Sequence, residues 1–234
     1  MRIKSLFITL FVCFPVLAGD FIKPAYGLWA VGMSVSDRNY TGTTLRYTPA
    51  PLIFGGYGPV WIEANRLGYT FFRSHGWFAS VAAQLRTHQF RKDDKELSDR
   101  RSALEAGLQV GKRLFGNWVL RLALLQDVSG AHKSREADVQ LYTHFFPGPF
   151  SLLTAVGVQY QTAALTNFYY GTHDYKPRAG FVTELESILT LPLGNWGVFV
   201  GLRYWFFDKQ AASSPIANGN RISTLFTGIG YYFD

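Results

Sequence analysis

Long segments in which apolar and polar residues alternate are the feature that most constrains how this chain folds. In 196–206, large apolar side chains occupy every second position, with Gly197, Gly201 and Arg203 between them. The same period of two runs through 77–88, 117–125 and 150–161. Because successive side chains of a strand point to opposite faces, each segment predicts a strand with one apolar and one polar face. A usual strand has about 5–6 residues, whereas a tilted strand that crosses a bilayer needs about 9–11, and these segments reach the longer value.

The composition favours strands that cross a membrane over helices that do so. Beyond residue 18 no apolar run approaches the roughly 18 residues of a transmembrane helix, and the mean hydropathy is only +0.03. Aromatic residues often open or close the apolar faces, at Trp77, Trp118, Phe145, Tyr160 and Trp196, as in the aromatic girdles of membrane barrels. Since hydrocarbon offers no hydrogen bonds, such strands must close on themselves to pair their backbone groups. We therefore predict an all-β fold, a closed antiparallel transmembrane β-barrel.

The connections between strands alternate between short and long, and this alternation predicts the topology. Short turns lie near 73–76, 115–117, 147–149 and 194–195, and long polar links at 89–100, 128–134, 162–178 and 208–220. Short periplasmic turns and longer outer loops are typical of outer-membrane barrels. The count gives twelve strands, near 26–35, 44–53, 58–64, 67–73, 77–88, 102–114, 117–127, 136–146, 150–161, 180–192, 196–207 and 222–233. Prolines and glycines interrupt the pattern in 44–73, so ten strands remain an alternative.

The first residues have the pattern of a secretory signal peptide. Arg2 and Lys4 precede an apolar stretch over 6–16, and Val16 and Ala18 are suited to a cleavage site. We expect cleavage after Ala18, which makes 1–18 the signal peptide and 19–234 the barrel, with cleavage after Ala25 as the weaker alternative. The only cysteine, Cys13, lies in this segment.

Charged side chains on the polar faces are expected to point into the barrel. A charge facing lipid would cost roughly 2–4 kcal/mol at the midplane. The inward candidates are Glu63, Arg86, Glu105, Arg113, Arg121, Glu184, Glu186 and Arg203. Two interpretations stay open: opposite charges pair across a narrow, plugged interior, or they line a channel for small solutes.

One outer loop gathers residue types that also occur in hydrolases. Asp127, Ser129, His132 and Ser134 lie close in sequence, and a nucleophile needs a base within reach. No nucleophile elbow and no metal-ligand spacing accompanies them. We therefore predict a solvated loop with no cofactor or metal, and a lipid-modifying barrel hydrolase is an alternative. Among the other histidines, His75 is assigned to a periplasmic turn, and His88, His144 and His173 to structural roles.

A mixed run of charges, 91–96 with Asp99, Arg100 and Arg101, predicts a second solvated outer loop. Its cations are suited to pair with phosphates of lipopolysaccharide. No nucleic-acid partner is expected, because basic residues are scattered over strand ends rather than gathered on one face.

Several stretches, in order along the chain, resemble the MipA/OmpV family of MltA-interacting outer-membrane proteins. Segment 120–132 resembles the family's R-x-x-L-x-Q-D-x-S-G-x-H strand and loop, 168–171 its Y-[FY]-G loop, 212–216 its D-S-P-[IL] loop, and 226–233 its closing G-x-G-Y-x-F. Segments 27–40, 47–51 and 66–69 also fit. The family-motif loop residues are Gln126, Asp127, Gly130, His132, Tyr170, Gly171, Ser214 and Pro215. Ser213 stands where the family commonly has Asp.

The resemblance implies a non-catalytic outer-membrane barrel that serves as a scaffold. In this role the protein would join a murein-degrading lytic transglycosylase to a murein synthase through its periplasmic turns and rim. The candidate contacts are Arg73, His75, Lys112, Arg113 and Asn117. Other members of the family are described as adhesin-like or porin-like, and a small-solute channel is the first rival.

Overall fold

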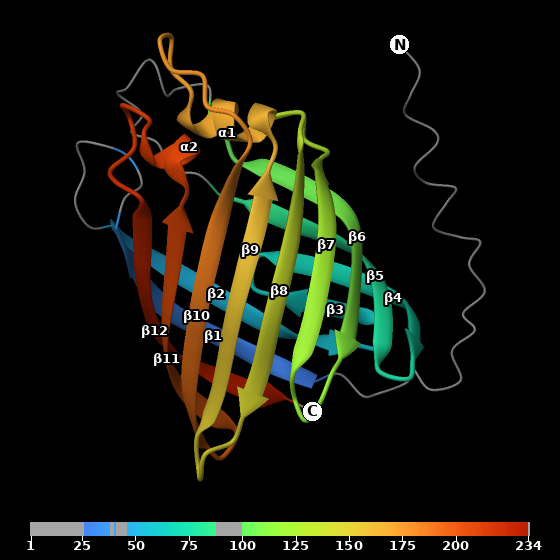
Figure 1. Cartoon of the computed structure of the whole chain (residues 1–234). Helices are drawn as coiled ribbons and strands as arrows, with labels where there is room; N and C mark the ends of the chain where they lie inside the picture. Colours follow the sequence, from blue (N-terminus) through green and yellow to red (C-terminus); the bar gives the residue numbers. More distant parts are fainter. Residues whose placement is uncertain (1–25, 38–39, 41–45, 88–99, 234) are drawn as a thin grey trace.

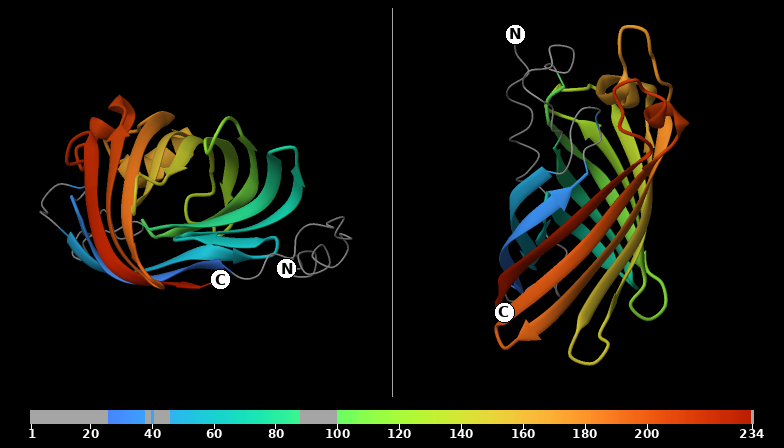
Figure 2. Two further views of the ribbon diagram at one scale, coloured as in Figure 1. Left: turned by 90° about the horizontal axis from the view of Figure 1, so that it is seen from below. Right: turned by 90° about the vertical axis from the view of Figure 1, so that its left-hand side faces the viewer.

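Twelve antiparallel strands close into one barrel in the computed structural model, which describes residues 26–37, 40, 46–87 and 100–233. Each strand pairs with its neighbours in sequence, and β1 pairs with β12, so that Gly27 stands opposite Phe233 (Figures 1 and 2). The strands are β1 (Tyr26–Ser36), β2 (Arg46–Tyr57), β3 (Val60–Glu63), β4 (Arg66–Ser74), β5 (Trp77–Arg86), β6 (Ala103–Arg113), β7 (Val119–Asp127), β8 (Arg135–Phe145), β9 (Ser151–Gln161), β10 (Gly180–Leu193), β11 (Trp196–Phe207) and β12 (Arg221–Phe233). The prediction of a twelve-stranded antiparallel barrel is confirmed.

The period of two in the sequence separates the two faces of the wall. Along β11, Val198, Val200 and Leu202 are exposed, whereas Phe199 and Gly201 between them are buried. Apolar side chains therefore face outward and polar or small ones inward, the reverse of a soluble sandwich. Ring pairs such as Trp118 with Phe145 lie at the short-turn end, with centroids 6.0 Å apart.

The region that the sequence left uncertain does contribute strands. β2, β3 and β4 all join the barrel, which excludes the ten-strand alternative. β3 has only four residues and pairs with residues 54–57 of β2 and 66–69 of β4. The interruption in the pattern therefore reflects a short strand, not a missing hairpin.

Two short helices, α1 (Ala163–Tyr170) and α2 (Lys209–Ala212), lie in links that the sequence analysis described only as long polar loops. Both lie at the outer end of the barrel, and a view from below shows α1 within the outline of the barrel (Figures 1 and 2). Asp208 caps α2 by accepting hydrogen bonds from the backbone N–H groups of Gln210 and Ala211. Neither described helix is long and apolar enough to pass through a bilayer.

Candidate functional site

The lumen contains a network of paired charges that joins strands that are not neighbours in the wall. Arg86 on β5 contacts Glu105 on the neighbouring β6 at 2.9 Å and also reaches Glu136 on β8. Both carboxylates are almost completely buried. The guanidinium therefore connects β5 to β8, which β6 and β7 separate in the strand order.

Two further arginine–carboxylate pairs cross the lumen. Arg66 on β4 contacts Asp138 on β8 at 2.8 Å and donates to Gln84 Oε1. Arg121 on β7 contacts Glu63 on β3 at 2.9 Å. All three cross-lumen bridges start on β3, β4 or β5 and end on β7 or β8.

The other half of the barrel carries a local cluster. Arg203 on β11 lies 3.2 Å from Glu184 and also contacts Glu186, both on the adjacent β10. Among the described residues, the ion pairs of the lumen thus involve four arginines and six carboxylates. A buried charge is costly unless it is paired, so these contacts allow the inward charges to exist.

The sequence analysis missed three members of the network, Arg66, Glu136 and Asp138. A signal was present in 135–145, where Glu136, Asp138 and Gln140 occupy alternate positions. The burial pattern of β8 becomes irregular after Asp138, where Thr143, at a position of the other face, is also buried. Arg66 starts β4 beside the short β3, where alternation is too brief to assign a face.

The loop after β7 is only partly solvated, whereas we predicted a solvated loop: Ser129 and Lys133 are exposed. Asp127, His132 and Ser134 are all buried. The carboxylate of Asp127 accepts hydrogen bonds from the backbone N–H groups of Ser129, His132 and Lys133. Asp127 therefore organises the loop, and the loop folds His132 inward beneath the rings of Phe168 and Tyr169.

His132 links a serine to a carboxylate. Its Nδ1 lies 2.6 Å from Ser134 Oγ and its Nε2 lies 3.0 Å from Glu105 Oε1. The order hydroxyl, imidazole, carboxylate is that of a hydrolase triad, but the imidazole has no exposed surface and Glu105 is shared with Arg86. This arrangement fixes the loop on the ion network. Within the described part of the chain, no three His, Cys, Asp or Glu side chains are placed to hold a metal ion.

Arg100 is also buried, whereas we predicted it in a solvated loop; 91–96 and His88 lie outside the described residues. Its guanidinium donates to the carbonyl oxygens of Tyr169, at 3.1 Å, and Gly171. These carbonyls end α1, where the helix dipole favours a cation. Arg100 therefore attaches the loop before β6 to α1.

The outer cap is the cluster of Tyr40, Leu165, Tyr169, Tyr170 and Ala211. Ser214 Oγ donates to the carbonyl of Tyr170 at 2.6 Å, and Tyr40 Oη donates to the carbonyl of Tyr169 at 3.3 Å. Burial raises the pKa of the Tyr40 and Tyr169 hydroxyls above the ordinary value, so both are neutral donors.

The family-motif loop residues contribute unequally to the outer cap. Tyr170, Gly171 and Ser214 belong to it or contact it directly, and His132 packs beneath it. Gln126 and Pro215 are exposed, and Gly130 has φ of 73°, which glycine adopts without strain.

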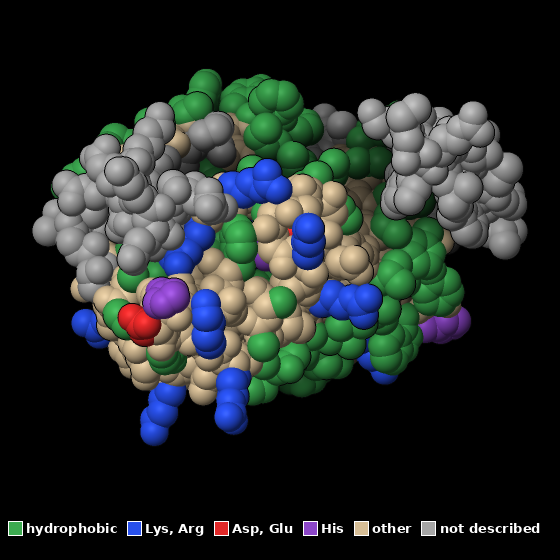
Figure 3. Space-filling view, turned by 90° about the horizontal axis from the view of Figure 1, so that it is seen from above, with side chains coloured by type: hydrophobic (Ala, Val, Ile, Leu, Met, Phe, Trp, Pro, Cys, Tyr) green, Lys and Arg blue, Asp and Glu red, His purple; other side chains and the backbone are tan. Residues whose placement is uncertain are grey.

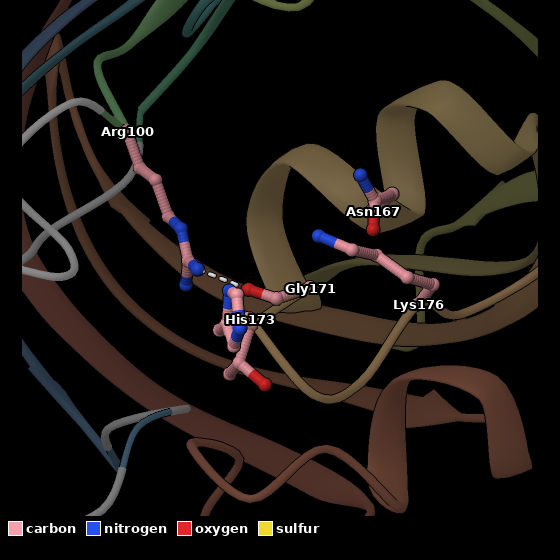
Figure 4. A pocket seen from close by; sticks show the side chains of 6 residues that line it. Arg100, Asn167, Gly171, His173 and Lys176 are labelled. Carbon is pink, nitrogen blue, oxygen red and sulfur yellow. Dashed lines mark hydrogen bonds between the residues drawn. The ribbon is translucent and has the colours of Figure 1, made fainter.

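A cavity of about 290 Å³ opens beside the outer cap and is lined by Arg100, Asn167, Gly171, Thr172, His173 and Lys176. Figure 4 shows Arg100 reaching to Gly171 and the Lys176 ammonium directed towards Asn167. Lys and Arg side chains are spread over this end of the molecule, whereas acidic side chains show at few places (Figure 3).

Four of the five periplasmic candidates lie around the β4–β5 turn and the end of β6. Arg73, His75 and Arg113 are exposed, and the backbone N–H of Arg113 donates to the Gly76 carbonyl at 2.8 Å. The Lys112 ammonium lies 4.7 Å from the centre of the Trp77 ring. Asn117 lies further along the rim and donates to the His144 carbonyl at 2.9 Å.

A closed wall with an apolar outside and a charged, polar inside defines the class of transmembrane β-barrel proteins. The family model described as MltA-interacting protein MipA matches residues 30–233. The chain therefore belongs to the MipA family, as its motifs indicated.

Known relatives and structures have low sequence identity to this chain. The MltA-interacting proteins of Escherichia coli (strain K12) and Shigella flexneri are each 24% identical over 219 residues, covering 86% of this chain and 88% of the relative. Among solved structures, the NanC porin in its rhombohedral crystal form has a TM-score of 0.46 at 9% identity, covering 87% of this chain and 98% of that chain.

Proposed function

We propose that this protein is a non-catalytic outer-membrane scaffold that binds a lytic transglycosylase at its periplasmic end and presents it to a murein synthase. Residues 1–18 would direct export, and 19–234 would form the membrane-embedded part. The names of the family and of the Escherichia coli relative, both MltA-interacting, support the transglycosylase as partner.

The observation that carries the proposal is the engagement of the inward charges with one another. Three bridges cross the lumen, and a packed outer cap lies at its outer end. Because the interior charges are paired with one another, the two ends of the barrel are the surfaces at which a partner would bind. The periplasmic rim supplies a cationic surface at Arg73 and Arg113, both exposed.

The outer end is suited to a second contact, with lipopolysaccharide. Its exposed cations are suited to bind phosphates: Arg101, Lys133, Arg135, Lys176, Arg178 and Lys209. Such contacts would hold the barrel in the outer leaflet while the opposite end faces murein.

Co-purification tests the scaffold directly. We expect a lytic transglycosylase to be recovered with the tagged chain from solubilised envelopes at native expression. Arg73→Glu with Arg113→Glu should lower recovery about tenfold, as expected for losing roughly 1.4 kcal/mol of binding. Arg221→Glu, an exposed change at the opposite end, is the control. Repeated failure to recover the enzyme with the unaltered chain would contradict the proposal.

A cation-selective channel is the second candidate, favoured by the excess of carboxylates in the lumen network, six against four arginines. Conductance across a planar bilayer that changes when Arg121 and Arg203 are replaced would favour it. If correctly folded protein gives no conductance across the planar bilayer, the channel is excluded.

A further inference from the structure

The pairing ladder of the wall is interrupted on one side of β2. β3 pairs only with residues 54–57, so residues 46–53 of β2, its outer half, have no strand on that side among the described residues. On the other side the same residues pair with β1 throughout. The outer half of β2 is therefore an edge within a barrel that is otherwise closed.

The backbone groups that point to this edge can be identified from the alternation of the ladder. The carbonyl of Ile53 accepts a hydrogen bond from the N–H of Ala64, at 2.8 Å, so Ile53 directs its backbone groups away from β1. Every second residue of a strand does the same, which adds Tyr47, Pro49 and Pro51. The two prolines have no N–H, so the edge presents carbonyl acceptors and almost no donors.

On the far side of the interruption, the backbone groups of Leu85 in β5 are paired by Asn65. Asn65, in the turn between β3 and β4, accepts from the Leu85 N–H and donates its side-chain N–H to the Leu85 carbonyl, each at 2.9 Å. The edge of β5 is therefore satisfied, whereas the edge of β2 is blunted by proline. Proline on an exposed edge prevents pairing with another strand.

The interruption lies between two different environments. On the outer face, Tyr47 is 65% exposed and Pro49 is also exposed. On the inner side, Arg66 begins β4 next to the interruption and is held by Gln84 and Asp138. No described residue donates to the backbone carbonyls of Tyr47, Pro49 and Pro51. Because carbonyls without donors are costly in hydrocarbon, water or a ligand with donors is suited to this edge.

We propose that the interruption is a hydrated lateral opening through which an amphipathic molecule with hydroxyl or amide donors passes between the outer leaflet and the lumen. The donors of the head group would meet the carbonyls of Tyr47, Pro49 and Pro51, while the apolar tail stays in the lipid. The outer cap lies over the outer end of the lumen. The lateral opening would therefore give a route into the lumen through the wall instead of along the barrel axis.

Single cysteines test the hydration, because the only native cysteine, Cys13, lies in the predicted signal peptide. Pro49→Cys places a thiol beside the edge. Met33→Cys is the matched control, since Met33 stands opposite Pro49 in the register, faces outward and lies between β12 and β2. In phosphatidylcholine vesicles, a charged methanethiosulfonate reagent should modify Pro49→Cys about ten times faster, because thiolates form in water and are suppressed in apolar surroundings. Equal rates would overturn the proposal.

A second pair of variants tests passage of an amphipathic molecule. Leu52 lies on the inner face at the edge, opposite the buried Ala30, and Val182 is a buried inner residue behind the paired wall of β9–β11. Dodecyl methanethiosulfonate dissolved in the bilayer should modify Leu52→Cys faster than Val182→Cys. If the charged reagent modifies Pro49→Cys as expected but dodecyl methanethiosulfonate modifies Leu52→Cys and Val182→Cys at equal rates, the edge is hydrated but the amphipathic molecule does not pass. That result would overturn the proposed passage. Should Pro49→Cys fail to fold, Tyr47→Cys replaces it with the same expected result.

Discussion

The two halves of the barrel satisfy the same physical requirement in different ways. From β9 to β12 the strands are long and each is paired on both sides, and the inward Arg203 is paired with carboxylates on the next strand. From β3 to β5 the wall includes a four-residue strand, and each of these three strands sends a charged side chain across the lumen. Where the backbone ladder is interrupted, side-chain bridges from β7 and β8 support the structure.

The largest expected effect is the loss of a cross-lumen bridge. Arg86→Ala leaves two buried carboxylates, Glu105 and Glu136, without their cation and should destabilise the barrel by about 3–5 kcal/mol. Urea unfolding of protein folded into vesicles measures it, with Arg221→Ala, an exposed arginine, as control. Equal unfolding midpoints for the two variants would show that the bridge does not support the wall.

A smaller effect is expected for the local cluster in the other half. Arg203→Ala should cost about 1–3 kcal/mol, because its side chain is one-third exposed at 32% and its strands are held by complete ladders. The same urea titration measures it. A loss as large as that of Arg86→Ala would remove the distinction between the two halves.

The turn beside β3 should contribute less again. Asn65→Ala removes the side-chain donor to the Leu85 carbonyl and should cost about 0.5–1.5 kcal/mol. Asn65→Gln, which keeps the amide on a longer side chain, is the comparison variant. Unfolding at an unchanged urea concentration would mean that water already satisfies Leu85.

The smallest effect concerns lipid chemistry, where we expect none. Ser129→Ala and His132→Ala should leave the lipid profile of the envelope unchanged, since the imidazole has no exposed surface. His132→Ala should still lower stability, because Glu105 and Ser134 lose a partner. Mass spectrometry of extracted lipids checks both variants. An altered acyl-chain profile would revive the hydrolase interpretation.

Much of the wall could be predicted because membrane and lumen impose opposite demands on neighbouring residues. Alternation located the strands of β5 to β12 closely, and it assigned Arg121 and Arg203 to a polar face. It predicted a strand near 58–64 but left ten strands as an alternative, because β3 has only four residues, too few to establish a period.

The outer cap could not be predicted from local pattern. The burial of Arg100 and His132 depends on contacts with α1. Tyr169 of α1, which both residues contact, lies 69 residues after Arg100 in the sequence. Their polar neighbours resemble those of any solvated loop. The family motifs include His132 and the end of α1, but a motif does not state which loops contact one another.

The most direct test of the central claim is a nitroxide scan along β11 in lipid vesicles, one cysteine at a time from residue 197 to 202. The account predicts oxygen accessibility that alternates, high at Val198, Val200 and Leu202 and low at Gly197, Phe199 and Gly201. Accessibility without a period of two, or a mature chain that stays monodisperse in detergent-free buffer, would contradict it.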